Sequence, residues 1–153
     1  MSHPAFSQVT IVVVTYNSAH CLPMLSPLMS VCPNVLISDN GSDDGTADKA
    51  QMLWSHVTVL AHGRNLGFGA ANNRALAQVR TPFALLLNPD CEMTPLALLA
   101  LLLVSLALVL RFLATGDGQT AATLSVVIKT LTLYTIMITG CIWEKVVFGR
   151  YLF

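Results

Sequence analysis

The chain has 153 residues, and its eight basic and eight acidic side chains give a formal net charge of zero. This length is enough for one domain with a real core, and the balanced charge gives no indication of electrostatic binding to nucleic acid. Charged residues make up only 10% of the chain, against about 25% in an ordinary soluble domain. The deficit falls mainly after Thr94, where Leu, Val and Ala dominate, so we place the main boundary near Pro95.

The cysteines and the amino terminus indicate a reducing compartment. Cys21, Cys32, Cys91 and Cys141 form no Cys-x-x-Cys pair and have no histidine at zinc-site spacing. We therefore expect buried thiols. Residues 1–8 lack a positive segment followed by an apolar core, so we expect no signal peptide and a cytoplasmic amino-terminal part.

Apolar runs that read as strands alternate with segments that read as helices. The expected strands are residues 9–14, 35–38, 57–61 and 83–87, and the expected helices lie within 20–31, 47–54 and 70–79. Thr46 or Asp44 is the expected N-cap of the second helix. The run 83–87 is uniformly apolar, which predicts a strand buried on both faces. This alternation predicts an α/β fold with a mostly parallel, doubly wound sheet.

Polar loops follow the first two expected strands, at the sheet edge where α/β proteins bind ligands. Residues 15–18 (Thr-Tyr-Asn-Ser) can present backbone groups and an aromatic face to a flat base, although Tyr16 can equally be a packed residue. The loop 39–46 contains three carboxylates, two glycines and hydroxyls. An acidic loop that contains glycines suits recognition of ribose or base hydroxyl and imide groups better than phosphate. No P-loop or dinucleotide fingerprint is present, so we expect neither of those sites. A solvated or calcium-like turn is the alternative, but the spacing fails the EF-hand pattern.

The loops after the third and fourth expected strands could meet a diphosphate. Gly67 and Gly69 allow the backbone to pass close to a ligand at a helix start. Arg64 or Arg74 could face the phosphates, although each alone is more often a surface charge. Asp90 ends the last strand, where an acid could meet a charged ligand or a metal; the alternative is that residues 88–90 are only a turn.

Four ordered motifs resemble family 2 of the glycosyltransferases, the inverting nucleotide-sugar enzymes of the GT-A fold. They are Val12–Asn17, Ile37–Thr46, Asn65–Asn73 and Leu86–Asp90. The resemblance covers about residues 8 to 95. The Gly-Phe-Gly at 67–69, the Asn-Asn at 72–73 and Asn-Pro-Asp in place of Asp-x-Asp are most similar to the rhamnosyltransferase and galactofuranosyltransferase branch.

The resemblance implies a role for individual residues. The implied nucleotide-binding residues are Thr15, Tyr16, Asn17, Asp39, Asn40, Gly67, Asn73 and Asn88. Asp39 would accept a hydrogen bond from a uracil or thymine imide. Asp90 matches the last acid of the metal motif and would hold Mn²⁺ or Mg²⁺ against the diphosphate. The general base of inverting transfer is an acid in the acceptor half, and the only acids after Glu92 are Asp117 and Glu144, neither in a recognisable motif. The catalytic base is therefore not assigned.

The segment from residue 95 onward is strongly apolar. Residues 96–110 are apolar apart from Ser105, with Thr94 as the expected N-cap of a helix, and residues 121–143 form a second apolar stretch. Two interpretations compete: a membrane hairpin that suits a lipid-linked acceptor, and an aberrant tail from truncation or a shifted reading frame. We divide the chain into a nucleotide-sugar-binding half domain, 1–94, and an apolar tail, 95–153.

The sequence predicts a glycosyltransferase-like protein for cell-wall or polysaccharide biosynthesis. It would bind a dTDP- or UDP-sugar with a divalent metal and transfer the sugar to a glycan or lipid-linked acceptor. The alternatives are a non-catalytic truncated remnant that keeps the nucleotide pocket, and a small membrane-associated protein. No nucleic-acid partner is expected. The predicted location is cytoplasmic, with peripheral or integral association with the cytoplasmic membrane left open.

Overall fold

The computed structural model describes residues 3–115, apart from the side chains of residues 108, 109, 112, 113 and 115. In this part the strands are β1 (Val9–Thr15), β2 (Val35–Asp39), β3 (Thr58–Ala61) and β4 (Phe83–Leu87). The 3₁₀ helices are η1 (Pro4–Gln8) and η2 (Leu22–Leu25), and the α-helices are α1 (Ser26–Met29), α2 (Thr46–Leu53), α3 (Phe68–Leu76) and α4 (Pro95–Thr115). Every expected strand and helix in this range is present.

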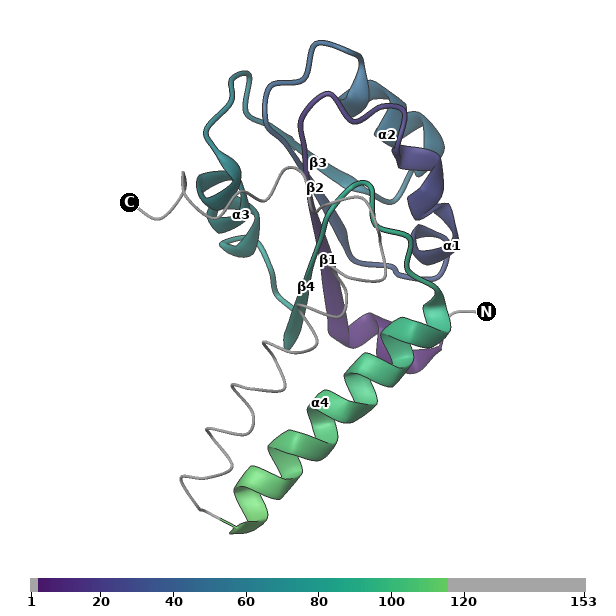
Figure 1. Cartoon of the computed structure of the whole chain (residues 1–153), viewed down its shortest axis with the longest axis vertical. Coiled ribbons are helices and arrows are strands. Elements are labelled where there is room, and N and C mark those ends of the chain that lie inside the picture. Colours follow the sequence, from purple (N-terminus) through teal and green to yellow (C-terminus); the bar gives the residue numbers. More distant parts are fainter. Residues whose placement is uncertain (1–2, 116–153) are drawn as a thin grey trace. The chain divides into compact units, whose positions relative to one another are not determined.

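The four strands form one parallel sheet in the order β3-β2-β1-β4 (Figure 1). All seven residues of β1 are buried, which fits a central strand that is rich in β-branched side chains. In register, Thr15 of β1 pairs with Asp39 of β2, and Asp39 pairs with Ala61 of β3. The parallel α/β architecture with flanking helices is thereby confirmed.

Helices cover the two faces of the sheet (Figure 1). On one face, α3 packs on β1 and β2, where Ala75 joins Val12 and Leu36 in a buried cluster. On the other face, α2 packs on β2 and β3. Pro23 and Pro27 limit the segment 20–31 to the short η2 and α1. Both faces of the central strands are therefore buried.

The prediction that residues 83–87 are buried on both faces is wrong. Within the described residues β4 is an edge strand that pairs only with β1, and its burial alternates along the strand. Leu86, which pairs with Val12, is 47% exposed. Because α3 packs over β1 and β2, the same face of β4 stays open at Leu86.

The expected N-cap of α2 is also wrong. The N-cap is Gly45, which has a φ of 77°, a left-handed conformation that glycine adopts without strain. Asp44 instead reaches forward, and its Oδ1 accepts a hydrogen bond from the Thr46 backbone N–H at 3.0 Å. The acid therefore serves the first turn from one position earlier than the cap.

The chain divides into two compact units, Met1–Leu99 and Ala100–Phe153. Helix α4 begins in the first unit, where Leu98 is fully buried and Thr94 Oγ1 accepts from the Ala97 backbone N–H at 3.2 Å. The expected cap at Thr94 is thus confirmed. Among the residues that the structure describes together with their side chains, no helix is both long enough and apolar enough to cross a membrane. The apolar stretch 121–143 and the acids Asp117 and Glu144 lie outside the described residues.

Three cysteines fall in the described part, and all three are buried as expected: Cys21, Cys32 and Cys91. Burial raises the pKa of the Cys32 thiol to about 11. That thiol is therefore protonated at neutral pH and acts as an apolar filler. Cys141 lies outside the described residues.

Candidate functional site

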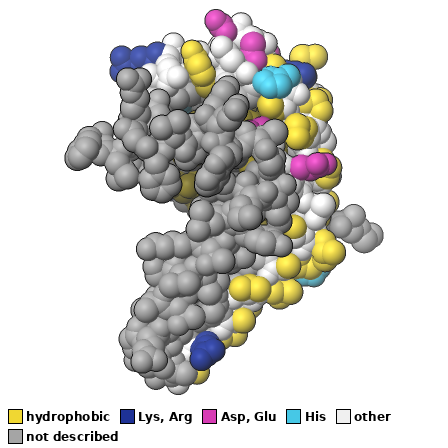
Figure 2. All heavy atoms as spheres, viewed as in Figure 1, with side chains coloured by type: hydrophobic (Ala, Val, Ile, Leu, Met, Phe, Trp, Pro, Cys, Tyr) yellow, Lys and Arg dark blue, Asp and Glu magenta, His cyan; other side chains and the backbone are white. Residues whose placement is uncertain are grey.

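The loops that follow β1, β2 and β3 meet at the carboxyl edge of the sheet (Figure 1). Acidic side chains gather at the same end of the first unit (Figure 2). Two backbone hydrogen bonds extend the strand pairing into these loops: Asn40 N–H donates to Thr15 O at 2.8 Å, and His62 N–H donates to Asp39 O at 2.9 Å. The loops are thus held together from their first residues.

Asp39 is the buried carboxylate at the centre of this edge, and it is only 3% exposed. Its Oδ1 accepts from Thr15 Oγ1 at 2.9 Å and from Ser42 Oγ at 2.5 Å. Its Oδ2 accepts from the Ser42 backbone N–H at 3.0 Å. An ionised carboxylate offers about four acceptor positions. Donors among residues 3–115 fill three of them, which leaves one acceptor position on Oδ2.

A second set of hydrogen bonds joins the β1 loop to the start of α2. Ser18 N–H donates to Thr46 Oγ1, and Ala19 N–H donates to Asp44 Oδ2, both at 2.9 Å. Lys49 Nζ donates to Ala19 O at 2.7 Å. Asp44 therefore holds its own loop and the neighbouring loop, so its carboxylate is structural. These hydrogen bonds account for the presence of Asp44, one of the three acids of the loop, without a bound ion.

Side-chain amides join the β2 loop to the β3 loop. Asn40, 3% exposed, donates through Nδ2 to Asn65 Oδ1 at 2.8 Å and accepts at Oδ1 from the Leu66 N–H at 2.8 Å. Asn65 Oδ1 also accepts from the Gly67 N–H at 2.9 Å. Gly67, with a φ of 84°, then begins α3 as its N-cap. Asn40 is thus a structural link within the edge rather than an exposed ligand group.

The other predicted site residues differ in their exposure. Thr15 is fully buried and holds Asp39, whereas Tyr16 is 53% exposed beside it. Asn17 is exposed in a left-handed conformation with a φ of 49°, and Asn73 is exposed on α3. Asn88 and Asp90 are half-buried after β4. Hydrogen bonds therefore connect the loops that contain six of the predicted site residues: Thr15, Tyr16, Asn17, Asp39, Asn40 and Gly67. No described hydrogen bond joins the side chains of Asn73, Asn88 or Asp90 to these loops.

No cluster of three or more His, Cys, Asp or Glu side chains within residues 3–115 could enclose a metal ion. Asp90 alone is compatible with a different kind of site. Mg²⁺ usually keeps several waters and is held by one or two carboxylates together with substrate phosphates. A single half-buried acid at the end of a strand fits that donor set, with Asn88 as a further oxygen donor.

Three residues of this edge escaped the sequence analysis. Ser42 and Asn65 make the central contacts to Asp39 and Asn40, and His62 Nε2 lies 2.7 Å from the buried Ser38 Oγ. Because the single Ser38 hydroxyl hydrogen is donated to Ala71 O, the His62 ring nitrogen is the donor in that pair. The only signal for Ser42 and Asn65 in the sequence was their place inside two of the motifs.

We expect Asp44 to make the stability of the fold sensitive to acid. The Thr46 hydroxyl and then the backbone N–H groups of Ala19 and Thr46 lower the pKa of this carboxyl below its ordinary 3.8. A lowered folded-state pKa stabilises the fold above the unfolded value, and this stability is lost as the pH falls through the folded pKa. Asp44→Asn should therefore flatten the fall of stability below about pH 4. Urea unfolding between pH 2.5 and 7 measures this change in the free energy of unfolding. Asp48→Asn, at an exposed position of α2, is the control.

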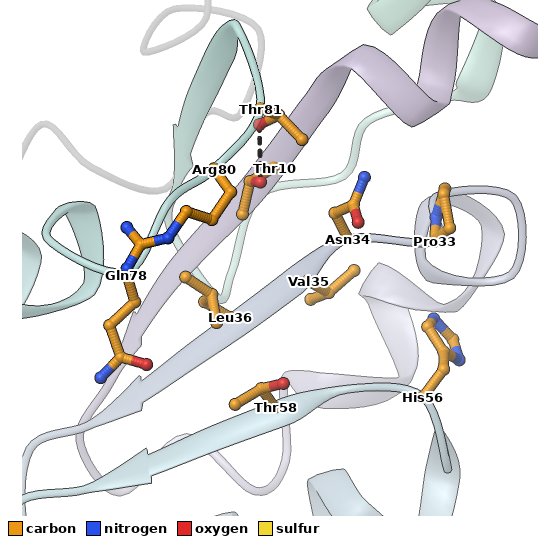
Figure 3. Close-up of a pocket in the computed structure, with 10 residues that line it drawn as sticks. All are labelled: Thr10, Pro33, Asn34, Val35, Leu36, His56, Thr58, Gln78, Arg80 and Thr81. Atoms are coloured by element: carbon orange, nitrogen blue, oxygen red, sulfur yellow. Dashed lines mark hydrogen bonds between the residues drawn. The ribbon is translucent and has the colours of Figure 1, made fainter.

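A separate hollow lies at the opposite, amino-terminal edge of the sheet (Figure 3). Its volume is about 200 Å³, and its lining includes Asn34, His56, Gln78 and Arg80. Thr10 and Thr81 close one side through a hydroxyl contact of 2.7 Å. None of the predicted site residues lines it. The hollow is therefore distinct from the carboxyl-edge loops.

Comparison with known proteins divides the chain between two families. Residues 10–104 match glycosyl transferase family 2, and residues 90–153 match the 2-vinyl bacteriochlorophyllide hydratase family. The chain is 33% identical over 107 residues to N-acetylglucosaminyl-diphospho-decaprenol L-rhamnosyltransferase of Mycobacterium tuberculosis, which covers 60% of the chain and 35% of that relative. It is 74% identical over 50 residues to 2-vinyl bacteriochlorophyllide hydratase of Rhodobacter capsulatus, and 70% over 50 residues to that of Cereibacter sphaeroides.

The hydratase matches cover 33% of this chain and 29% and 31% of the two relatives. The chain thus spans about a third of the length of each of these curated relatives.

Proposed function

Because the chain belongs to glycosyl transferase family 2, we propose that its first unit binds the nucleoside diphosphate of a dTDP- or UDP-sugar at the carboxyl edge of the sheet. The observation that carries the proposal is the geometry of Asp39. Its one remaining acceptor position on Oδ2 suits a single N–H donor, and the imide of uracil or thymine is such a donor. Tyr16, 53% exposed on the adjacent loop, offers a ring face on which a base can stack.

A divalent cation is the proposed cofactor, with Mn²⁺ and Mg²⁺ as the candidates. Asp90 would hold it against the diphosphate, and Asn88 would add an oxygen donor. The bound cation would neutralise the charge that develops on the leaving diphosphate. The chain's own residues would bind and orient the nucleotide. Asp39 would accept a hydrogen bond from the base. Asn40 and Asn65 accept hydrogen bonds from the Leu66 and Gly67 backbone N–H groups and so fix the start of α3.

The proposed reaction is inverting transfer of a sugar to a glycan or lipid-linked acceptor. The mycobacterial relative, an N-acetylglucosaminyl-diphospho-decaprenol L-rhamnosyltransferase, supports an L-rhamnosyl donor and a polyprenyl-linked acceptor. A lipid-linked acceptor would place the protein at the cytoplasmic face of a membrane. No general base is assigned within residues 3–115, so a nucleotide-binding remnant without transfer is the matched alternative.

Calorimetric titration of the full chain with UDP and dTDP, with and without Mn²⁺, tests the proposal. We expect metal-dependent binding in the wild type. Asp39→Asn should weaken it about tenfold or more, because the neutral amide loses a charged acceptor that is worth about 1.5–3 kcal/mol. Asp90→Ala should abolish the gain that Mn²⁺ brings and leave metal-free binding unchanged.

Asp48→Asn is the matched control for the loss of one carboxylate, because Asp48 lies exposed on α2 and should bind like the wild type. Well-folded wild-type protein that binds neither nucleotide would contradict the proposal. Sugar transfer to a polyprenyl-linked acceptor by the same preparation would separate the enzyme from the remnant.

The hydratase matches favour a second candidate function for the carboxyl-terminal part of the chain, which overlaps the glycosyltransferase match at residues 90–104. We propose that residues 90–153 form a pigment-binding segment related to the hydratases, supported by the 74% identity over 50 residues. An absorbance titration of the full chain with bacteriochlorophyllide tests binding, and an unshifted spectrum at saturating protein contradicts it.

A further inference from the structure

The hydrogen bonds between the β1 and β2 loops converge on the side chain of Ser42. Its Oγ donates to Asp39 Oδ1 at 2.5 Å and accepts from the Asn17 backbone N–H at 2.9 Å. Its backbone N–H donates to Asp39 Oδ2 at 3.0 Å. One hydroxyl therefore contacts both the buried carboxylate and the backbone that follows Tyr16.

The backbone on both sides of Tyr16 is fixed by the same network. Asn17 has a left-handed φ of 49°, and its Oδ1 accepts from the Asp43 backbone N–H at 3.0 Å. Ser18 Oγ accepts from Tyr16 N–H at 3.2 Å and donates to Tyr16 O at 3.1 Å. Left-handed residues other than glycine are uncommon, so these contacts select the conformation. They leave the Tyr16 side chain 53% exposed beside Asp39.

We propose that Ser42 is a positioning residue that sets base specificity, an inference that rests on the nucleotide binding proposed above. By its contact with Oδ1 it fixes which way the free position of Asp39 Oδ2 points, and by its contact with the Asn17 N–H it holds the backbone that follows Tyr16. A carboxylate only accepts hydrogen bonds. Uracil and thymine present an N–H at ring position 3, whereas cytosine presents an acceptor nitrogen there. The wild type should therefore bind UDP about 30-fold more tightly than CDP, as expected for one hydrogen bond to a charged group.

The test compares UDP and CDP affinities of the full chain in the wild type, Ser42→Ala and Ser42→Thr. Ser42→Ala should weaken UDP binding about tenfold and CDP binding less than twofold, because only UDP uses the oriented acceptor. Ser42→Thr keeps the hydroxyl and should restore most of the preference. Ser30→Ala is the matched control: it removes an exposed hydroxyl that bonds only the local Pro27 carbonyl at 3.0 Å, and it should change neither affinity.

A merely structural role for Ser42 would weaken UDP and CDP binding equally, and that result overturns the proposal. If Ser42→Ala does not fold, as judged by its circular dichroism, Ser42→Cys takes its place, because a thiol is a much weaker hydrogen-bond donor and acceptor than the hydroxyl it replaces. An unchanged UDP-to-CDP ratio in Ser42→Cys then overturns the proposal. If the wild-type protein binds neither nucleotide, the proposed function itself is contradicted. If it binds and the variants keep the preference for UDP, only the role of Ser42 is contradicted.

Discussion

Gly41→Ala is expected to lower the free energy of unfolding by about 3 kcal/mol, the sum of a left-handed backbone cost and a steric clash. Gly41 has a φ of 81°, which costs a residue with a Cβ about 1–2 kcal/mol. The added Cβ would also come within 2.6 Å of Arg64 Cα and 2.7 Å of its backbone N and C. These are backbone atoms of the β3 loop, so they cannot rotate away, and the two loops must separate.

Gly45→Ala is the matched control for this prediction. Gly45 has a nearly identical φ of 77°, but apart from its own two chain neighbours no atom of the described residues lies within 4 Å of its added Cβ. It should therefore cost only the backbone term, about 1 kcal/mol. Urea unfolding followed by far-ultraviolet circular dichroism measures both variants. Equal losses of stability would show that the close approach of the β2 and β3 loops does not exist in solution.

Asn40→Asp is expected to cost about 3 kcal/mol at pH 8, although it changes the shape of the side chain very little. The Nδ2 donor becomes a carboxylate oxygen that faces Asn65 Oδ1 across 2.8 Å in a site that is 3% exposed. Asn65 cannot relieve the repulsion by turning its amide over. Its Oδ1 also accepts from the Gly67 N–H, and the turned amide would present N–H groups to that donor.

The pH dependence of this variant provides an internal check. Burial and the facing oxygen raise the folded-state pKa of the new carboxyl above its unfolded value. The loss of stability should therefore be full at pH 8 and shrink as the pH falls through the folded pKa, because a protonated carboxyl can donate to Asn65.

Asn34→Asp is the control, since Asn34 Nδ2 donates to Ser7 O at 3.1 Å at a half-exposed site where water can replace the bond. It should cost less than about 1 kcal/mol. If the two variants lose equal stability at pH 8, the Asn40–Asn65 contact does not exist in solution.

Together these contacts hold the loops of the candidate site in place without a ligand. Asp39, Ser42 and Asn17 fix one wall, and Asn40, Asn65 and Gly41 fix the next loop against it. Binding to such a site loses little conformational entropy in the protein, which is the advantage of preorganisation. We accordingly expect these loops to keep their conformation when a base binds. We also expect substitutions in them to affect stability as well as affinity.

The sequence alone determined the elements of the first unit, its fold class and its glycosyltransferase family, whereas the hydratase match of residues 90–153 was not predicted. β-branched and aliphatic runs such as residues 9–14 predict strands because the signal is local: composition and the punctuation by polar loops suffice. The same local spacing carried the four motifs, and the family match confirmed what they indicated. The loops that contain Tyr16 and Asp39 stood out as polar segments after apolar runs, and the role of Asp39 was implied by the family resemblance.

Tertiary structure alone decided what depends on residues far apart in the chain. The apolar run 83–87 gives the same signal at an edge as in the centre of a sheet, and only strand order leaves Leu86 47% exposed. The loop acids look alike in sequence, yet Asp39 is held by Thr15, 24 residues away, and Asp44 by Ala19, 25 residues away. Local periodicity reports which face of an element is apolar. It does not report which distant donor meets a carboxylate, because that depends on how the strands are ordered and on how the loops between them close.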